Sequence, residues 1–285
     1  MTFHLLFLGT PDFAVPTLKK IIKTFPQFKI SVISMPDKVR GRGKRVSFSD
    51  VKSFGVDHSI PVYTPVDKVA LSRQINVLSP DLIVVVAFGM IIEKVIVDRY
   101  FCINVHASLL PKYRGASPIQ TVLLNEENET GITIIKLNEF MDAGDILAQQ
   151  SIKISPSFNH GSLEKKLADL GADLCASFIK NQFLKDRVVA VKQNDFEASY
   201  CHKISKESLI VDRSMSNHDI LSRIRAFSPK PGVVYIQDKK RIKLLEASLI
   251  DQKLHLIKIQ PEGKPPMLYR DYLLGHAEGI DLHGN

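Results

Sequence analysis

The segment Phe101–Ala116, FCINVHASLLPKYRGA, carries an amide and an imidazole two residues apart, at Asn104 and His106. Its pattern predicts the end of a buried strand followed by a loop punctuated by Pro and Gly. Side chains alternate between the two faces of a strand, so residues i and i+2 share one face. Such a pair suits chemistry at a carbonyl, because the amide can stabilise an oxyanion while the imidazole moves a proton.

A carboxylate is the third group that such a site needs, and two candidates flank Ala143-Gly144 just before another expected strand: Asp142 and Asp145. A buried carboxylate beside His106 would orient the imidazole. We take Asp142 as the candidate and Asp145 as the competing choice. The alternatives are a solvated turn carboxylate for Asp142, a solvated turn carboxylate or a cap for Asp145 and, for His106, a core histidine with its hydrogen bonds satisfied.

Other chemistries fit these residues less well. A serine hydrolase built from Ser108, His106 and Asp142 would lack a G-x-S-x-G elbow, and its nucleophile would share a strand with its base. A metal site on His106 and Asp142 has no further ligands at recognisable spacing. We expect Cys102 to pack on its strand, because nothing nearby in the sequence indicates an activated thiolate.

Strands and helices alternate through the first two thirds of the chain. We expect strands at 4–8, 29–35, 60–63, 81–88, 100–109, 131–137 and 146–154. We expect helices at 13–25, 66–78, 117–125 and 161–183. This order predicts an α/β fold with a doubly wound, mostly parallel sheet, which binds ligands beyond the carboxyl ends of its strands. The first strand-to-helix turn, at Gly9, is not G-x-G-x-x-G, which argues against a dinucleotide cofactor.

The last third has a different pattern. Residues 193–215 are polar and irregular, as is typical of a linker. A helix is expected over 216–227 with Ser216 as its cap, followed by β-like runs at 233–237, 241–249 and 254–259. The sequence therefore predicts a catalytic domain at 1–192, a linker at 193–215 and a small β domain at 216–285.

A basic segment, Lys38–Arg45, follows the second expected strand. Five of its residues are cationic, and two glycines favour flexibility; the cations are Lys38, Arg40, Arg42, Lys44 and Arg45. A cationic loop at this sheet edge could grip the phosphates of a nucleic acid. The alternative is a solvated loop, which is the commoner role of a charge run.

Composition narrows the class of protein. The chain has 285 residues, of which 45% are hydrophobic and 24% charged, and this is typical of a globular protein. A net charge of +8 favours an anionic partner, nucleic acid first. Three widely spaced cysteines argue against a disulfide framework or a zinc site and favour the cytoplasm. No apolar run approaches the roughly 20 residues of a membrane span, and the N-terminus does not resemble a signal peptide.

With these residues in hand, the chain resembles the methionyl-tRNA formyltransferase family from its first strand to about Ser248. The motifs that carry the resemblance occur in the family's order and spacing: Gly9–Ala14, Pro61–Pro65, Val84–Gly89, Asn104–Pro111, Arg114–Ala116, Thr130–Thr133, Asp142–Asp145 and Ile224–Pro229.

The resemblance implies a Rossmann-like formyltransferase fold and formyl transfer from 10-formyltetrahydrofolate to the amino group of methionyl initiator tRNA, the reaction that precedes translation initiation. It implies that Asn104, His106 and Asp142 are the catalytic residues and that no metal takes part. It assigns the folate pocket to Ser108, Leu109, Leu110 and Pro111, and tRNA contact to Arg40, Arg42, Lys44 and Arg45. We also expect a monomer.

The resemblance also implies an OB-like barrel at the C-terminus. Such a barrel has about five strands, and only three β-like runs precede Gln260–Gly263. We therefore expect a reduced barrel. Two rival functions remain open: folate-dependent N-formylation of a nucleotide-linked amino sugar, and non-catalytic RNA binding on an enzyme-like scaffold.

Overall fold

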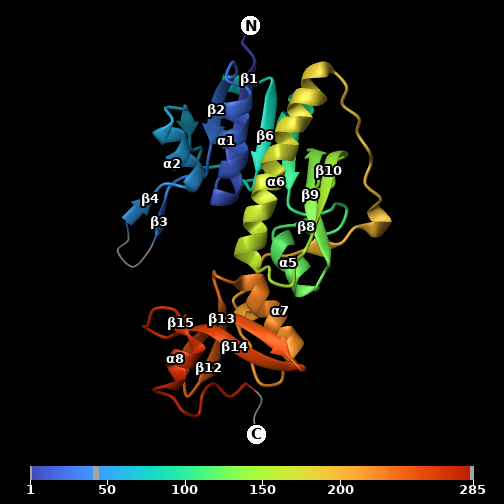
Figure 1. The fold of residues 1–285 in the computed structure, drawn as a ribbon. Helices are drawn as coiled ribbons and strands as arrows, with labels where there is room; N and C mark the ends of the chain where they lie inside the picture. The colour runs from blue at the N-terminus through green and yellow to red at the C-terminus, as the bar shows by residue number, and fades with distance from the viewer. Residues whose placement is uncertain (1, 41–44, 283–285) are drawn as a thin grey trace. The chain divides into compact units, whose positions relative to one another are not determined.

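A computed structural model describes residues 2–40 and 45–282, which form two compact units (Figure 1). The first comprises Met1–Arg114, Gly131–Ile152 and Lys165–Tyr200, and the second Gly115–Thr130, Lys153–Glu164 and Cys201–Asn285. The division into domains at 192 and 216 that we expect from the sequence stays a prediction. No helix in the described part of the chain is long and apolar enough to cross a membrane.

A seven-stranded sheet, in the order β10-β9-β7-β6-β1-β2-β5, forms the framework of the first unit. β1 pairs in parallel with β2 and β6, β2 with β5, and β6 with β7, whereas β9 is antiparallel to β7. The expected mostly parallel sheet is therefore confirmed. The strands are β1 (His4–Gly9), β2 (Lys29–Ile33), β5 (Val62–Tyr63), β6 (Leu82–Val86), β7 (Cys102–His106), β9 (Glu129–Lys136) and β10 (Ile146–Lys153).

The central strands form because their sequences are apolar on both faces. Every residue of β1 and β6 is buried, as expected for parallel strands covered by helices on either side. The helices of the described chain are α1 (Val15–Thr24), α2 (Asp50–Asp57), α3 (Lys68–Leu78), α4 (Lys94–Arg99), α5 (Pro118–Leu124), α6 (His160–Asn181), α7 (Asn217–Phe227) and α8 (Tyr269–Leu273). We did not expect α2, α4 or α8, which are too short to show a clear apolar period.

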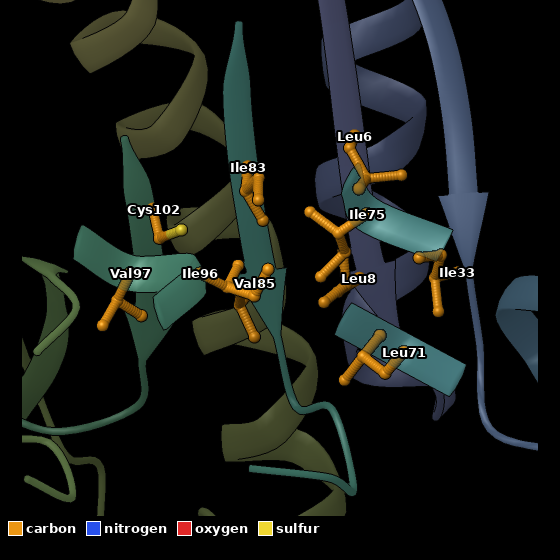
Figure 2. Packing of buried hydrophobic residues seen from close by; sticks show 10 residues of the cluster. All are labelled: Leu6, Leu8, Ile33, Leu71, Ile75, Ile83, Val85, Ile96, Val97 and Cys102. Carbon is orange, nitrogen blue, oxygen red and sulfur yellow. The ribbon is translucent and has the colours of Figure 1, made fainter. Parts of the chain in front are cut away.

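The two faces of the sheet are covered by different helices, which makes the fold doubly wound. On one face, side chains of α3 and α4 pack against β1, β2, β6 and β7; Figure 2 shows Leu6, Leu8, Ile33, Leu71, Ile75, Ile83, Val85, Ile96, Val97 and Cys102. On the other face, α6 approaches so closely that a Cβ at Gly171 would lie 3.0 Å from the Val105 side chain. Residues 102, 104 and 106 of β7 therefore belong to the α3–α4 face.

The second unit contains an antiparallel four-stranded sheet in chain order, β12 (Val233–Gln237), β13 (Lys240–Ile250), β14 (Lys253–Pro261) and β15 (Met267–Leu268). The turns β12–β13 and β13–β14 place two successive residues at positive φ, Asp238-Lys239 and Asp251-Gln252, as tight two-residue hairpins require. Ser216 caps α7 by accepting from the Asp219 N–H at 3.1 Å, as expected. The three expected strands are confirmed, and β15 adds a fourth.

The basic segment, whose conformation the sequence leaves open, forms regular structure in its described part. β3 (Lys38–Arg40) and β4 (Arg45–Ser47) pair antiparallel, with Arg40 opposite Arg45. Figure 1 shows this hairpin extending away from the sheet. Arg42 and Lys44 lie outside the described residues.

Candidate active site

Asn104 and His106 occupy the carboxyl end of β7, the edge at which a doubly wound sheet binds its ligands. β7 is fixed on both sides, since Asn104 pairs with Val85 of β6 and with Ile135 of β9. His106 is only 6% exposed. The buried CINVH strand thus presents an amide and an imidazole on one face, next to a loop.

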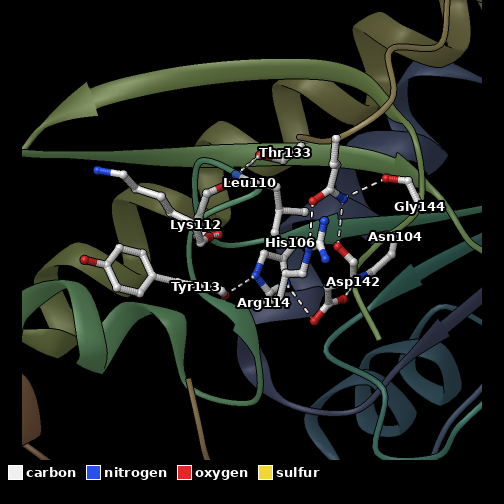
Figure 3. Close-up of polar contacts among 11 residues, drawn as sticks. Asn104, His106, Leu110, Lys112, Tyr113, Arg114, Thr133, Asp142 and Gly144 are labelled. Atoms are coloured by element: carbon white, nitrogen blue, oxygen red, sulfur yellow. Dashed lines mark hydrogen bonds and ion pairs between the residues drawn. The ribbon is translucent and has the colours of Figure 1, made fainter. Parts of the chain in front are cut away.

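The loop between β9 and β10 brings a carboxylate to both groups (Figure 3). The Asn104 Nδ2 donates to Asp142 Oδ1 at 3.2 Å, and His106 Nδ1 lies 3.6 Å from Asp142 Oδ2. The Asp142 side chain is 13% exposed. The three residues grouped from the sequence therefore lie together, with Asp142 in contact with both partners. No contact joins Asp145 to either group among the described interactions.

The backbone assigns the two nitrogens of the His106 ring. Nε2 lies 2.9 Å from the carbonyl oxygen of Tyr113, which can only accept, so Nε2 carries a proton. Nδ1 is then the nitrogen that faces Asp142. Since both ring nitrogens have partners, neither is directed at Ser108, whose hydroxyl donates to the Lys112 carbonyl at 2.6 Å. This geometry argues against a serine hydrolase.

The site loops adopt strained backbone conformations. Asp142 has φ 51° and Tyr113 has φ 62°, in the left-handed region that residues with a Cβ seldom occupy. Gly144 is the one position in the 142–145 turn where space excludes a side chain, because a Cβ there would lie 1.7 Å from the Lys136 carbonyl oxygen. Strain of this kind persists only where the surrounding structure holds it in place.

Part of that surrounding structure is a group that our sequence analysis missed. Gln193 donates through Nε2 to the carbonyl oxygens of Asp142 at 2.8 Å and Gly144 at 2.7 Å. Its Oε1 accepts from Nε of Arg114, which is 3% exposed. Gln193 lies 51 positions from Asp142 in a segment that looked like a linker, so no local pattern could reveal it.

The Ser108–Pro111 turn, to which the family resemblance assigns folate, is held by hydrogen bonds to the side chains of Thr133 and Gln149. The Thr133 hydroxyl accepts from Leu110 N and donates to the Ser108 carbonyl, while Gln149 Nε2 donates to the Leu110 carbonyl. The Ser108 and Leu110 side chains are buried, and those of Leu109 and Pro111 are partly exposed. A ligand could therefore meet the side chains of the turn only at Leu109 and Pro111.

The base of the basic hairpin is fixed by side chains, although its tip lies outside the description. Lys52 Nζ contacts Asp37 Oδ2 at 2.6 Å, and the hydroxyls of Ser34 and Ser49 lie 2.6 Å apart. Ser49 also caps α2 by accepting from the Lys52 N–H at 3.1 Å. These contacts join the end of β2 to the start of α2, so the hairpin leaves the sheet at a fixed place.

Among the described residues, other reactive groups do not form a second centre. Burial raises the pKa of the Cys102 thiol to about 12, which leaves it protonated at neutral pH, contrary to a nucleophilic role. Across residues 2–40 and 45–282, no three His, Cys, Asp or Glu side chains cluster as metal ligands. An open hollow of about 670 Å³ lies in the second unit, but its charged lining is mixed in sign, with Arg241, Lys264, Asp238 and Glu262.

Comparison with known proteins agrees with the fold and identifies the family. The signature of the formyl transferase family matches residues 3–179, and that of the formyl transferase C-terminal domain matches residues 203–255. The chain is therefore a formyltransferase.

The particular family follows from curated relatives. Methionyl-tRNA formyltransferase of Caldanaerobacter subterraneus subsp. tengcongensis is 35% identical over 96% of this chain and 97% of its own, and that of Syntrophomonas wolfei is 39% identical over 98% and 96%. The chain belongs to the methionyl-tRNA formyltransferase family.

Solved structures show the same fold at lower identity. A methionyl-tRNA formyltransferase from Clostridium thermocellum superposes with a TM-score of 0.63 at 16% identity, covering 91% of this chain and 99% of that one. A sugar 3N-formyl transferase, solved in the presence of dTDP and 5-N-formyl-THF, gives 0.66 at 21% identity and 88% coverage of each chain.

Proposed function

We propose that this chain transfers the formyl group of 10-formyltetrahydrofolate to the amino group of methionyl initiator tRNA. The observation that carries the proposal is the convergence of Asn104, His106 and Asp142 at a sheet edge in a member of this family. The amine nitrogen attacks the formyl carbon; the new C–N bond forms and the bond to folate N10 breaks. The amine loses a proton, and N10 gains one.

Each of the three residues has a role that its contacts support. The Asn104 amide has two N–H groups and uses one of them on Asp142, so the other can donate to the developing oxyanion. His106 holds Nε2–H against Tyr113, so the ring can act only through Nδ1. Asp142 orients that ring and takes the amine proton, directly or through one water.

The residues around Asp142 fit a flat aromatic ligand such as the pterin end of folate, whose ring faces can pack against apolar side chains. Phe140 and Met141, which precede Asp142, are exposed although they are large and apolar. Leu109 and Pro111 are the partly exposed side chains of the turn after β7. Folate supplies the formyl carbon; the protein supplies the apolar contacts that hold it and the donors that face its oxygen.

We assign binding of the tRNA to the cationic side chains of the basic segment. The basic segment with Arg40, Arg42, Lys44 and Arg45 follows β2 at the same sheet edge as β7, and the net charge of +8 favours a polyanion. Cytoplasmic location is inferred from cysteine usage, and the monomeric state stays a prediction.

The test offers two acceptors to the purified protein with 10-formyltetrahydrofolate: charged initiator tRNA and a nucleotide-linked amino sugar. We expect formyl-methionyl-tRNA and no formylated sugar. Transfer to the sugar alone would replace the proposal with the rival enzyme. Absence of transfer to either, with tRNA binding intact, would indicate an RNA-binding protein without catalysis.

A further inference from the structure

The segment 191–201, here called the strap, returns to the active site after α6. Val191 bridges to Ile146 at the start of β10, and Ser199 contacts the loop that follows β7. The Ser199 hydroxyl accepts from Tyr113 N at 2.9 Å, and its carbonyl accepts from Arg114 N at 2.8 Å. The strap thus touches both loops that build the site.

Near the start of the strap, Gln193 makes three hydrogen bonds whose directions are fixed by the chemistry of the partners. A guanidinium can only donate, so the atom 2.9 Å from Arg114 Nε must be the amide oxygen of Gln193. The amide nitrogen therefore faces the two carbonyls, Asp142 O and Gly144 O. A side-chain amide is the group that can satisfy an arginine and two carbonyls at once.

Arg114 is placed to hold that amide. Its guanidinium is buried, and a buried charge is costly unless it is paired. Nη2 donates to Asp195 Oδ1 at 2.7 Å, and Nη1 lies 3.4 Å from the Tyr200 hydroxyl. Both partners belong to the strap, so Arg114 fastens the strap over the catalytic loop and aims Gln193 at it.

The 142–144 turn is where that fastening acts. Asp142 keeps its left-handed backbone only if neighbours hold it, and Gln193 binds the carbonyls on both sides of Ala143. Figure 3 shows Gly144 beside Asp142 and Asn104. The bond to Asp142 O fixes the peptide plane next to the Asp142 side chain, and the bond to Gly144 O holds the other end of the turn.

We propose that Gln193, aimed by Arg114, is a positioning residue for formyl transfer: it locks the 142–144 turn so that the Asp142 carboxylate stays against Asn104 and His106. The inference rests on the proposed function, because it takes Asp142 to act in the transfer. Gln193 touches the backbone of the loop, so its effect is expected on the rate of the chemical step.

Gln193→Glu is the diagnostic variant. It keeps length and shape and still accepts from Arg114, but it turns a carboxylate oxygen toward two carbonyls that need donors. We expect kcat to fall about 10- to 100-fold, the usual effect of a small misplacement of a catalytic group. KM for tRNA and for folate should stay within about twofold, because Gln193 contacts none of the side chains assigned to either substrate.

Controls separate positioning from folding. Gln150→Glu makes the same chemical change at an exposed glutamine of β10 and should leave kcat unchanged. Gln193→Met removes the donors without adding charge and should reproduce the loss. Near-normal kcat in a folded Gln193 variant would overturn the proposal, as would unfolding of both variants, which would make the residue merely structural.

The failure of this inference and the failure of the proposed function give different results. The wild-type enzyme is first assayed with both acceptors, which decides the function. The ratio of variant to wild-type kcat is then measured with whichever acceptor is formylated. Formylation of the amino sugar by the wild type would overturn the proposed function while leaving the ratio for Gln193→Glu to decide the role of the strap.

Discussion

The catalytic loop and the basic hairpin both follow strands of the seven-stranded sheet but are held in different ways. Asp142 has side-chain contacts to Asn104 and His106, and its backbone is bound by Gln193. The hairpin is joined by three backbone register pairs between β3 and β4, with side-chain contacts at its base. Chemistry requires atoms placed within fractions of an ångström, whereas attraction of phosphates requires mainly charge.

The largest effect is expected at the catalytic loop. Asn104→Ala, His106→Ala and Asp142→Asn should each lower kcat about 100- to 1,000-fold, because they remove the amide that donates to the oxyanion, the imidazole beside it and the carboxylate that contacts both. Single-turnover transfer to charged tRNA measures the step, and circular dichroism checks the fold.

Asp145→Asn is the matched control for this contrast, since it makes the same change three positions away. It should keep near-normal kcat. A collapse at Asp145 with normal rates at Asp142 would exchange the roles of the two carboxylates.

Substitutions in the basic segment should change tRNA binding and leave the rate of the chemical step unchanged. Arg42→Ala should raise KM for tRNA about tenfold and leave kcat unchanged, because a phosphate contact contributes binding without touching the reaction. The slope of log affinity against log salt should fall by about one. Arg73→Ala, at an exposed position on α3, is the control. An unchanged KM and salt slope at Arg42 would leave the hairpin as solvated surface.

The base of the hairpin offers a smaller effect, on stability. Ser49→Ala removes the cap of α2 and the contact with the Ser34 hydroxyl, and should lower the free energy of unfolding by about 1 kcal/mol. Urea unfolding measures it, and kcat should not change. A large loss of kcat would show that the hairpin base and the catalytic loop are coupled, which would contradict the view that the two regions are held independently.

The smallest effect concerns the sheet that carries both loops. Burial, together with Lys29, lowers the pKa of His4, so this ring is neutral in the folded chain and takes up a proton more readily when unfolded. Stability from His4 is therefore complete above about pH 6.5 and is lost as pH falls below it, with a slope under about 1.4 kcal/mol per pH unit. His4→Gln should flatten that slope in urea unfolding between pH 7.5 and 5.5, values that bracket the ordinary His pKa of about 6.5. An equal slope in both proteins would contradict this.

The sequence predicts most of the fold because buried apolar runs determine most of it. The strands around His4, Leu82 and Val233 begin and end within one or two residues of their expected positions, since each is an apolar run bounded by polar or turn residues. β15 was missed because a strand of two residues has no period, and its place depends on pairing with Ile259.

The candidate site was predictable only in part, because local sequence patterns do not show which distant loops meet after folding. Asn104 and His106 are near in sequence, and Asp142 stands in a recognisable turn. Gln193 and Tyr113 act through one amide and one backbone carbonyl, and these roles depend on loops that meet only after folding. The family resemblance supplied the substrates, which no spacing of residues could have given.

The tight turns of the second unit offer positions at which substitution could make the enzyme more thermostable. Asp238, Lys239, Asp251 and Gln252 all adopt a backbone shape that suits glycine better, at a cost of about 1 kcal/mol per residue. These positions take no part in the assigned chemistry, so evolution or a protein engineer could exchange them for glycine and raise thermal tolerance while leaving turnover untouched.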